Sequence, residues 1–436
     1  MTDALSRRAF LTRAAVLGCS AAASPLWTPV SFASAPWDTR LVVIILRGAM
    51  DGLDVVQPYG APEYGDLRRT LAGGPEHGAM DLDGFFALHS EMAPLMPLWR
   101  KGELGFYHAV STPYRDKRSH FDGQDLLEAG TATLEKGGRD GWLNRMLQHL
   151  PGVEAQTAFA LGHGEMKVLA GSAPVADWSP EVDLSLSPQA ARLMARMMED
   201  DPLFHPALAE AMMLSEQPEP ELPEEDDLDS ADMGGMSGGM SGGMSGMSGG
   251  MNGGMADEAR PRQAQAGGKR KSSEVRIAEF AAEHLRRDTR LVSFSISGWD
   301  THGNQLRTLR PALKSLTETL LALHDGLGPE VWGKTAVVAM TEFGRTVRTN
   351  GTNGTDHGTG GAMLLAGGAL RGGRVYGRWP GLAEADLYAR RDLMPTSDVR
   401  AAAAWLLRGL SGLDRGVLES AVFPGLDMGT DPGLLL

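Results

Sequence analysis

Three short segments in the last third of this chain carry the residue types that a metal-centred hydrolase uses. They read GWDTHG at residues 298–303, TEFGR at residues 341–345 and TDHG at residues 355–358. Carboxylate oxygens combined with imidazole nitrogens suit zinc or another borderline divalent ion. The combination favours an enzyme with divalent metal ions as cofactors, of which zinc is the first choice, but it does not name a substrate.

The residues around Asp300 and His357 are the strongest candidate metal ligands. Asp300 and His302 are two positions apart, so in an extended segment both side chains point the same way and reach one ion. The alternative is an aspartate at a helix start with an incidental histidine. Asp356 and His357 lie in a glycine- and threonine-rich loop, residues 350–361, where glycines let a ligand approach the backbone closely.

Glu342, Arg345 and Asp51 each have a functional and a structural interpretation. Glu342 directly follows an apolar run and is a candidate ligand, while Arg345 is placed to hold an anionic group with two hydrogen bonds. The two can instead form an ion pair that stabilises the turn. Asp51 follows the first apolar run, as a ligand or as a turn residue, and Asp54 is a weaker candidate of the same kind.

The candidate nucleophile is Ser119, in the segment RSHFDGQD at residues 118–125. A hydroxyl at a helix start lies at the positive end of the helix dipole, which stabilises an alkoxide and a bound anion. Serine is also a favoured helix cap without any chemistry. His120 and Asp122 are alternative ligands or general bases. A weaker candidate is STPYR at residues 111–115, which has the S-x-P-x-R spacing of certain sulfatases but not the residues that normally follow.

Strands predicted from apolar runs place these segments. Residues 41–46, LVVIIL, read as a strand buried on both faces, and further strands are expected at residues 104–110, 291–297, 335–341 and 363–366. Two candidate segments directly follow such runs, and the carboxyl ends of strands are where open α/β sheets build their sites. The candidate side chains are therefore expected to meet at one edge of a sheet.

Helices are expected between these strands. Apolar spacing predicts them at residues 119–129, 142–150, 188–198, 275–287, 305–323 and 398–410, with Ser119 and Ser397 as caps of the first and the last. Strands that alternate with helices indicate a three-layer α/β fold around a central, largely parallel sheet.

The amino terminus predicts export. SRRAFL at residues 6–11 matches the twin-arginine signal, an apolar run follows at residues 14–26, and Ala33, Ser34 and Ala35 form a small-residue cleavage site. This predicts a signal peptide at residues 1–35, the twin-arginine translocation machinery as a partner and a periplasmic location. Residues 14–30 are short for a membrane anchor and contain two prolines. Lipidation of Cys19, the only cysteine, is a lesser alternative.

Charge and composition bound the remaining choices. The chain has 436 residues and a formal net charge of -14, which argues against nucleic acid as a partner. Residues 215–273 are acidic, then rich in Met, Gly and Ser at residues 233–255, then basic, and we expect them to form a disordered insertion. The insertion is either a linker or a Cu(I) site, because thioethers are ligands for Cu(I).

Several motifs together resemble one known family. The segments LRGAMDGLD, RSHFDGQD, GWDTHGNQ, TEFGRT and TDHGTGG, with the twin-arginine start, look like the bacterial exported family called domain of unknown function 1501 (DUF1501). The resemblance covers essentially the whole mature chain except the Met-rich insertion. That family is grouped with the alkaline phosphatase and sulfatase fold, which implies a single alkaline phosphatase-like domain at residues 36–214 and 274–436.

The resemblance also implies roles for individual residues. Asp51 and Glu342 resemble ligands of one ion, and Ser119 takes the nucleophile's place between two ions. The resemblance assigns the ligands of the second ion to Asp300, His302 and His357. The spacing departs from the superfamily, because one residue separates Asp300 from His302 where three are usual.

The expected function is an exported metal-dependent hydrolase of phosphate or sulfate esters that acts on a small anionic substrate. Metal ions would lower the pKa of the nucleophile, and Arg345 or Arg47 would hold the oxygens of the transferred group. The alternative is a non-catalytic envelope protein that binds metal or assists assembly and retains the fold, with possible copper binding by the Met-rich insertion.

Overall fold

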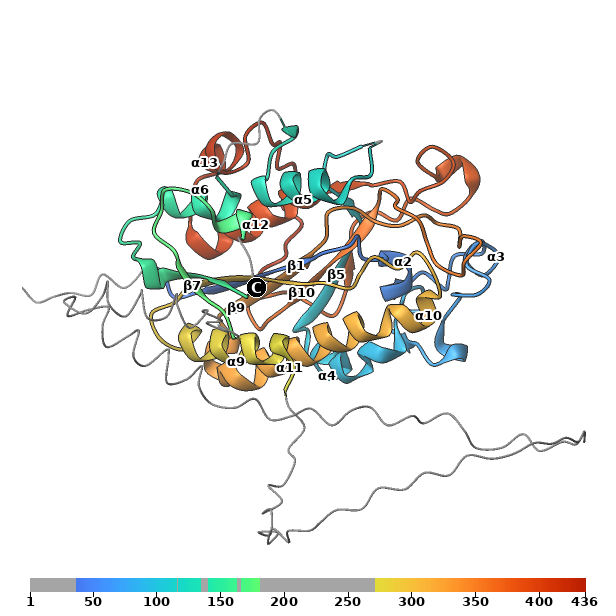
Figure 1. Ribbon diagram of the computed structural model, residues 1–436, viewed down its shortest axis with the longest axis horizontal. Coiled ribbons are helices and arrows are strands. Elements are labelled where there is room, and N and C mark those ends of the chain that lie inside the picture. Colours follow the sequence, from blue (N-terminus) through green and yellow to red (C-terminus); the bar gives the residue numbers. More distant parts are fainter. Residues whose placement is uncertain (1–36, 116, 135–139, 163–165, 181–270) are drawn as a thin grey trace, which may run out of the picture. The chain divides into compact units, whose positions relative to one another are not determined.

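A central sheet of nine strands organises the molecule (Figure 1). The strands are β1 (Arg40–Leu46), β5 (Leu104–Ser111), β6 (Ala158–Leu161), β7 (Ala176–Trp178), β8 (Leu291–Ile296), β9 (Thr335–Met340), β10 (Gly361–Ala366), β11 (Val375–Tyr376) and β12 (Ser397–Asp398). Their order is β11-β5-β10-β9-β1-β8-β6-β7, with β12 also paired to β5. Only β10 pairs with its neighbours in antiparallel fashion among the described strands of this sheet, so the prediction of a largely parallel sheet is confirmed.

The computed structural model describes residues 37–115, 117–134, 140–162, 166–180 and 271–436, which belong to one compact unit. The expected signal peptide with Cys19, the helix at residues 188–198 and the Met-rich insertion with its copper site lie outside the described residues. Among the helices that are described, none is long and apolar enough to cross a membrane.

The register of the central strands fixes where the candidate site forms. β1 lies between β8 and β9 and is parallel to both, with Leu46 opposite Ile296 and Ile45 opposite Met340. All three strands therefore end at the same edge of the sheet. The turn after β1, the GWDTHG segment after β8 and the TEFGR segment after β9 emerge side by side, as the sequence predicts.

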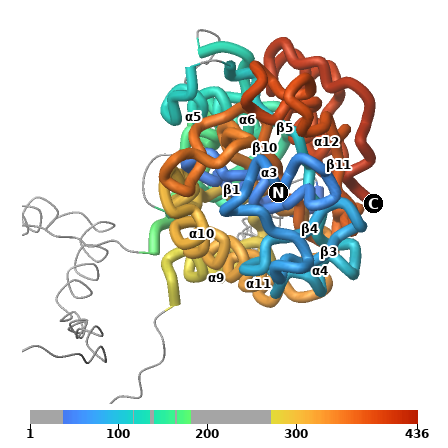
Figure 2. The backbone as a smooth tube through the Cα atoms, turned by 90° about the vertical axis from the view of Figure 1, so that its right-hand side faces the viewer, coloured from blue at the N-terminus to red at the C-terminus, as the bar shows by residue number. Residues whose placement is uncertain are grey.

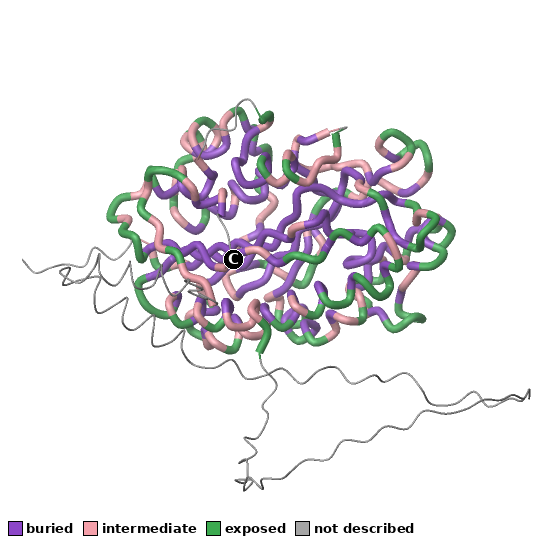
Figure 3. Tube along the Cα trace, viewed as in Figure 1, coloured by how far each residue is buried: buried purple, intermediate pink, exposed green. Residues whose placement is uncertain are grey.

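Alternating side chains of β1 separate two cores, because successive residues of a strand face opposite sides. Val42, Ile44 and Leu46 pack into the core beneath α9 (Ser273–Leu285) and α11 (Arg310–Trp332). Their neighbours in sequence pack into the opposite core with α6 (Trp142–Gln148) and α12 (Val399–Ser411). Figures 1 and 2 show these helices on the two sides of the sheet, and Figure 3 shows buried strands between helices with exposed outer surfaces. The three-layer prediction is thereby confirmed.

The remaining α-helices and strands of the described residues are short. They are α2 (Gly52–Val55), β2 (Val56–Gln57), α3 (Tyr64–Leu67), β3 (Met80–Asp81), β4 (Ala87–Leu88), α4 (Met96–Lys101), α5 (His120–Ala129), α10 (Gln305–Thr308) and α13 (Arg415–Val417). Strands β2, β4 and β3 form a separate small sheet.

One predicted helix is divided and one predicted cap is wrong, whereas the other predicted helices within the described residues begin and end within two residues of the expected bounds. The helix predicted at residues 305–323 is divided into α10 and α11, and α11 continues to Trp332 through a break at Gly328, where φ is 68°. The predicted cap Ser397 is wrong, because the carboxylate of Asp398 accepts the hydrogen bond of Arg400 N at 2.9 Å and caps α12 instead. Ser397 lies in β12, one residue before the helix cap.

Candidate metal centre

Four side chains from three loops converge at the edge where β1, β8 and β9 end. His120 is the first residue of α5, Asp300 and His302 follow β8, and His357 precedes β10. Ligand atoms of His120, Asp300 and His357 lie within 4.8 Å of one another. His302 joins them, since its Nε2 lies 3.0 Å from Asp300 Oδ1 and 2.9 Å from His357 Nε2. We call these four residues the metal centre, as a candidate site for an ion.

Each of the three histidines is held by a hydrogen bond at Nδ1. The partners are all acceptors, namely Glu342 Oε1 for His120 at 2.7 Å, Asp356 Oδ1 for His302 at 3.3 Å and the Arg118 carbonyl for His357 at 2.9 Å. Because an acceptor at Nδ1 requires the hydrogen there, a neutral ring presents the lone pair of Nε2 toward the centre. Metal-binding histidines are commonly oriented in this way.

The contact between His302 and His357 fits a shared proton or a cation. Their Nε2 atoms lie 2.9 Å apart, and two lone pairs at that distance repel unless a proton or a metal ion lies between them. Burial lowers the pKa of His357, which disfavours a proton on that ring. Ligand atoms around a tetrahedral zinc ion are roughly 3.3 Å apart for bonds of 2.0–2.1 Å. Asp300 Oδ1 lies 3.3 Å from His357 Nε2, so these donors fit such an ion.

His120 provides a second sign of a bound cation. Its Nε2 is buried and has no hydrogen-bond partner in the described part of the chain; the nearest acceptor, Asp300 Oδ2, is 3.4 Å away. The hydrogen bond to Glu342 raises the pKa of His120. A metal ion must displace the proton that this ring would otherwise take up, so metal affinity is expected to fall as the pH falls.

Glu342 orients His120 and does not itself face the centre. It is fully buried, and its Oε1 accepts from Gly48 N at 3.0 Å, Ala49 N at 3.1 Å and Gln124 Nε2 at 3.2 Å in addition to His120. Burial raises the pKa of Glu342, but these hydrogen bonds outweigh burial and lower the pKa below its usual value. We therefore reassign Glu342 from a metal ligand to the carboxylate that supports one.

Arg345 joins the loops and is not available as a clamp for substrate oxygens. Its buried guanidinium donates to the Asp300 carboxylate and to four backbone carbonyls, those of Gly48, Ala49, Trp299 and Thr355. Burial raises the pKa of Asp300, but Arg345 overcomes this effect and lowers it, so Asp300 is ionised. The alternative clamp, Arg47, is likewise engaged, with Glu128 at 2.8 Å.

Asp51 belongs to a buried ion pair apart from the metal centre. Its Oδ1 accepts from Arg68 Nη2 at 3.0 Å, and its Oδ2 accepts from Gln305 Nε2 at 2.7 Å. It also caps α2 through Leu53 N. Arg68 is fully buried and supplies the positive charge that a metal ion would otherwise provide. We therefore reassign Asp51 from a metal ligand to a structural partner of Arg68.

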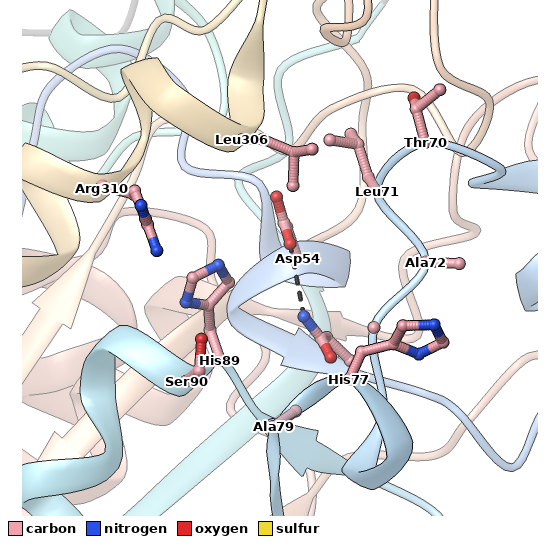
Figure 4. A pocket seen from close by; sticks show the side chains of 12 residues that line it. Asp54, Thr70, Leu71, Ala72, His77, Ala79, His89, Ser90, Leu306 and Arg310 are labelled. Atoms are coloured by element: carbon pink, nitrogen blue, oxygen red, sulfur yellow. Dashed lines mark hydrogen bonds between the residues drawn. The ribbon is translucent and has the colours of Figure 1, made fainter.

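Gln305 links this ion pair to the metal loops. Its Nε2 donates to Asp51 and to Asp54, each at 2.7 Å, and its Oε1 accepts from Thr301 Oγ1 at 2.9 Å and Thr355 Oγ1 at 2.7 Å. Thr301 separates the two ligands of the GWDTHG segment. Asp54, which accepts from Gln305, also lines a cavity of about 420 Å³. Figure 4 shows the carboxylate of Asp54 in this cavity, between Leu306 and His89.

The other predicted residues lie around the metal centre without joining it. Ser119 caps α5 by accepting from Asp122 N at 3.4 Å, which is the structural interpretation, and its role as nucleophile stays a prediction. Asp356 contacts the far nitrogen of His302 and is held by Asn350 at 3.0 Å, so it supports a ligand. In the STPYR segment, Ser111 is buried and its hydroxyl accepts from Arg115.

Sequence reasoning missed three residues that the site depends on. Gln124 lies in the motif RSHFDGQD and Gln305 lies in the motif GWDTHGNQ, and these motifs were the signal that could have identified them. Arg68 stands in no motif, and nothing in the sequence ties it to Asp51.

Replacing Glu342 by Gln is expected to weaken metal binding about 10–100-fold, the usual cost of losing a supporting partner of a histidine ligand. Competition with a chromophoric chelator measures the affinity. Glu128→Gln is the matched control, because Glu128 is a buried carboxylate of α5 that pairs with Arg47 and touches no histidine of the centre. Equal affinities of the two variants would contradict the supporting role of Glu342.

Arg68→Met is expected to lower the free energy of unfolding by about 3–5 kcal/mol, because it leaves the buried Asp51 charge without a partner. Burial raises the pKa of Asp51, but Arg68 lowers it below the unfolded value, so this stabilisation is present above that value and lost as the pH falls through the folded pKa.

Asp54→Asn is the control for Arg68→Met in the same network. Burial and the charge of Asp51 raise the pKa of Asp54, so a neutral amide is tolerated there. Urea denaturation of both variants at neutral pH measures the difference. If Asp54→Asn cost as much as Arg68→Met, the assignment of the charge to the Asp51–Arg68 pair would be wrong.

Gly354→Ala is expected to displace His302 and weaken metal binding. A Cβ at Gly354 would lie 2.3 Å from the carbonyl carbon of His302, whereas a Cβ at Gly351 meets nothing within 4 Å. Gly351→Ala, in the same turn, is therefore the control. Chelator competition and thermal unfolding of the two variants should separate them, and metal binding lost equally in both would refute this account.

The whole metal centre lies within the segment that matches a known family. The family model described as protein of unknown function (DUF1501) matches residues 109–420, which is more than half of the chain. No curated protein and no solved structure matches the chain. The chain therefore belongs to the DUF1501 family, as the motifs indicate.

Proposed function

We propose that this protein is an exported, metal-dependent hydrolase of phosphate or sulfate esters that acts at the centre formed by His120, Asp300, His302 and His357. The observation that carries the proposal is the 2.9 Å contact between the Nε2 atoms of His302 and His357, whose other ring nitrogens both face acceptors. Export by the twin-arginine pathway to the periplasm, expected from residues 6–11, is part of the same proposal.

The exposure of the centre favours catalysis over a structural metal site. The side chains of Asp300 and His302 are 45% and 48% exposed, whereas those of His120 and His357 are 24% and 19% exposed. One side of the centre is therefore open to solvent and the other is packed against the protein. Structural zinc sites are closed, whereas catalytic sites keep a position for water or substrate, which here would enter from the open side as a further ligand beside the four protein donors.

The surrounding residues suit hydrolysis of an anionic ester. A bound divalent ion would lower the pKa of water and neutralise charge that develops on the transferred group. Glu342 and the Arg118 carbonyl hold two ligands in place, and Arg345 keeps Asp300 ionised. Ser119 caps α5 beside His120, so the attacking oxygen is either its hydroxyl or a water.

Two observations support the rival function, a metal-binding envelope protein without turnover. Arg345 donates its hydrogen bonds to acceptors of the protein itself, so its guanidinium is not available to hold a substrate anion as expected. The Ser119 hydroxyl serves as a helix cap, so it has a structural reason to be present.

Metal analysis combined with an activity panel separates the two functions. The purified protein is expected to hold stoichiometric zinc or a similar divalent ion and to turn over a phosphomonoester, a phosphodiester or a sulfate ester. His302→Ala should lose both metal and activity, with His149→Ala, an exposed histidine of another surface, as control.

The variant Ser119→Ala then identifies the attacking group. Loss of turnover with metal retained assigns the nucleophile to Ser119, whereas unchanged turnover assigns it to water. Stoichiometric metal without turnover of any ester establishes the rival function. A protein that binds no divalent ion refutes both.

A further inference from the structure

A second cavity lies directly against the metal centre. It has a volume of about 210 Å³ and is lined by Arg348, Thr349, Asn350, Asp356, Arg390 and Arg391, among others. A water molecule takes up roughly 30 Å³ in the liquid, so the cavity has room for an oxyanion group together with a few waters.

Three hydrogen bonds connect the walls of this cavity to the metal ligands. Asp356 accepts from His302 Nδ1 at 3.3 Å, and Asn350 Nδ2 donates to the His302 carbonyl at 2.8 Å. On the other side, Arg391 donates to the His357 carbonyl at 3.0 Å. A group bound in the cavity would therefore be a near neighbour of a group bound at the centre.

The cavity is positively charged, although the chain as a whole carries a net charge of -14. Three arginines line it against the single carboxylate of Asp356. Guanidinium groups bind carboxylate, phosphate and sulfate through paired hydrogen bonds.

The arginines differ in how far the protein already neutralises them. Arg391 pairs with Asp392 at 3.0 Å, and Arg390 lies 3.6 Å from Glu384 in an exposed pair, which contributes little. Arg348 is exposed and has no ion pair within the described ranges. Its guanidinium is therefore available to a ligand. Asp392 also pairs with Arg118, whose Nη2 lies 3.4 Å from Asp392 Oδ2, so its negative charge is divided between Arg391 and Arg118.

The backbone at Arg390 is held in an unfavourable conformation. The backbone φ angles of Ala389 and Arg390 are 51° and 54°. Residues other than glycine rarely adopt positive φ. Such conformations concentrate at functional sites, where the surrounding structure imposes them. Here the turn carries Arg390 to the cavity beside the metal centre.

We propose that this arginine cavity binds a second anionic group of the substrate while the ester occupies the metal centre. The inference rests on the proposed hydrolase function and narrows its substrates to esters with a further carboxylate, phosphate or sulfate group near the ester. A free anion as ligand would show the same binding chemistry, so the test must distinguish the two.

The first experiment measures anion binding directly, without requiring turnover. Inorganic sulfate is titrated calorimetrically into the full protein, the double variant Arg348→Gln/Arg390→Gln and the control Arg100→Gln, an exposed arginine of α4. The double variant should bind sulfate at least tenfold more weakly, and the control should match the unsubstituted protein. Equal affinity in all three proteins overturns the inference.

The second experiment compares two aryl esters that are identical except for a ring carboxylate. The carboxylated ester should have a KM at least tenfold lower than the uncarboxylated one, and the double variant should abolish this difference. Arginine-dependent sulfate binding with equal KM values overturns the substrate role and leaves a site for a free anion. Arginine-dependent binding without turnover of either ester refutes the proposed hydrolase instead. Thermal unfolding confirms that the variants are folded.

Discussion

The metal centre depends on one buried guanidinium. Arg345 donates to the carbonyls of Gly48, Trp299 and Thr355, which belong to three loops that follow or precede different strands. A buried guanidinium costs much free energy unless its donors are paired, so these loops must stay where the carbonyls can reach it. The same group holds the Asp300 carboxylate, and the backbone bridge between Arg345 and His357 fixes the loop that carries a histidine. The parallel strands bring the loops to one edge, and Arg345 then sets their spacing.

The charges around the centre indicate the ion that would complete it. Asp300, Glu342 and Asp356 are all ionised, because hydrogen bonds lower each pKa below its usual value despite burial. Within the described residues, Arg345 is the one arginine or lysine in direct contact with these carboxylates, so two negative charges are left once an ion has displaced the proton that the raised pKa of His120 favours. A divalent cation balances them. The charge of the site therefore agrees with its geometry, since a cation between the Nε2 atoms of His302 and His357 would also relieve the repulsion of their lone pairs.

Local patterns in the sequence were sufficient for the choice of loops and for five of the nine strands of the sheet, namely β1, β5, β8, β9 and β10. The run LVVIIL predicts a strand buried on both faces, and β1 is the central strand with β8 and β9 on its two sides. Roles within the loops depended on partners that no local pattern contains. The sequence predicts that Arg345 holds a substrate anion. Its actual acceptors are mostly backbone carbonyls, and because every residue has one, no local pattern identifies them. Asp51 reads as a metal ligand because Arg68, its partner, is 17 residues away on a separate segment. A residue type states what a side chain can bind, and only the fold determines what is within its reach.

The reassignment of Asp51 and Glu342 bears on how many ions the site holds. The family resemblance implies that these two carboxylates share an ion, but here Asp51 pairs with Arg68 and Glu342 accepts from His120, Gln124 and two backbone amides. Protein donors therefore occupy both carboxylates, and within the described residues one group of metal-ligating side chains is found. Arg68 supplies a fixed positive charge where a second ion was expected. A guanidinium neutralises a carboxylate as an ion does, but it has no open coordination position and cannot activate a water molecule. In the proposed hydrolase, activation of the attacking oxygen would therefore rest on the single centre at His120, Asp300, His302 and His357.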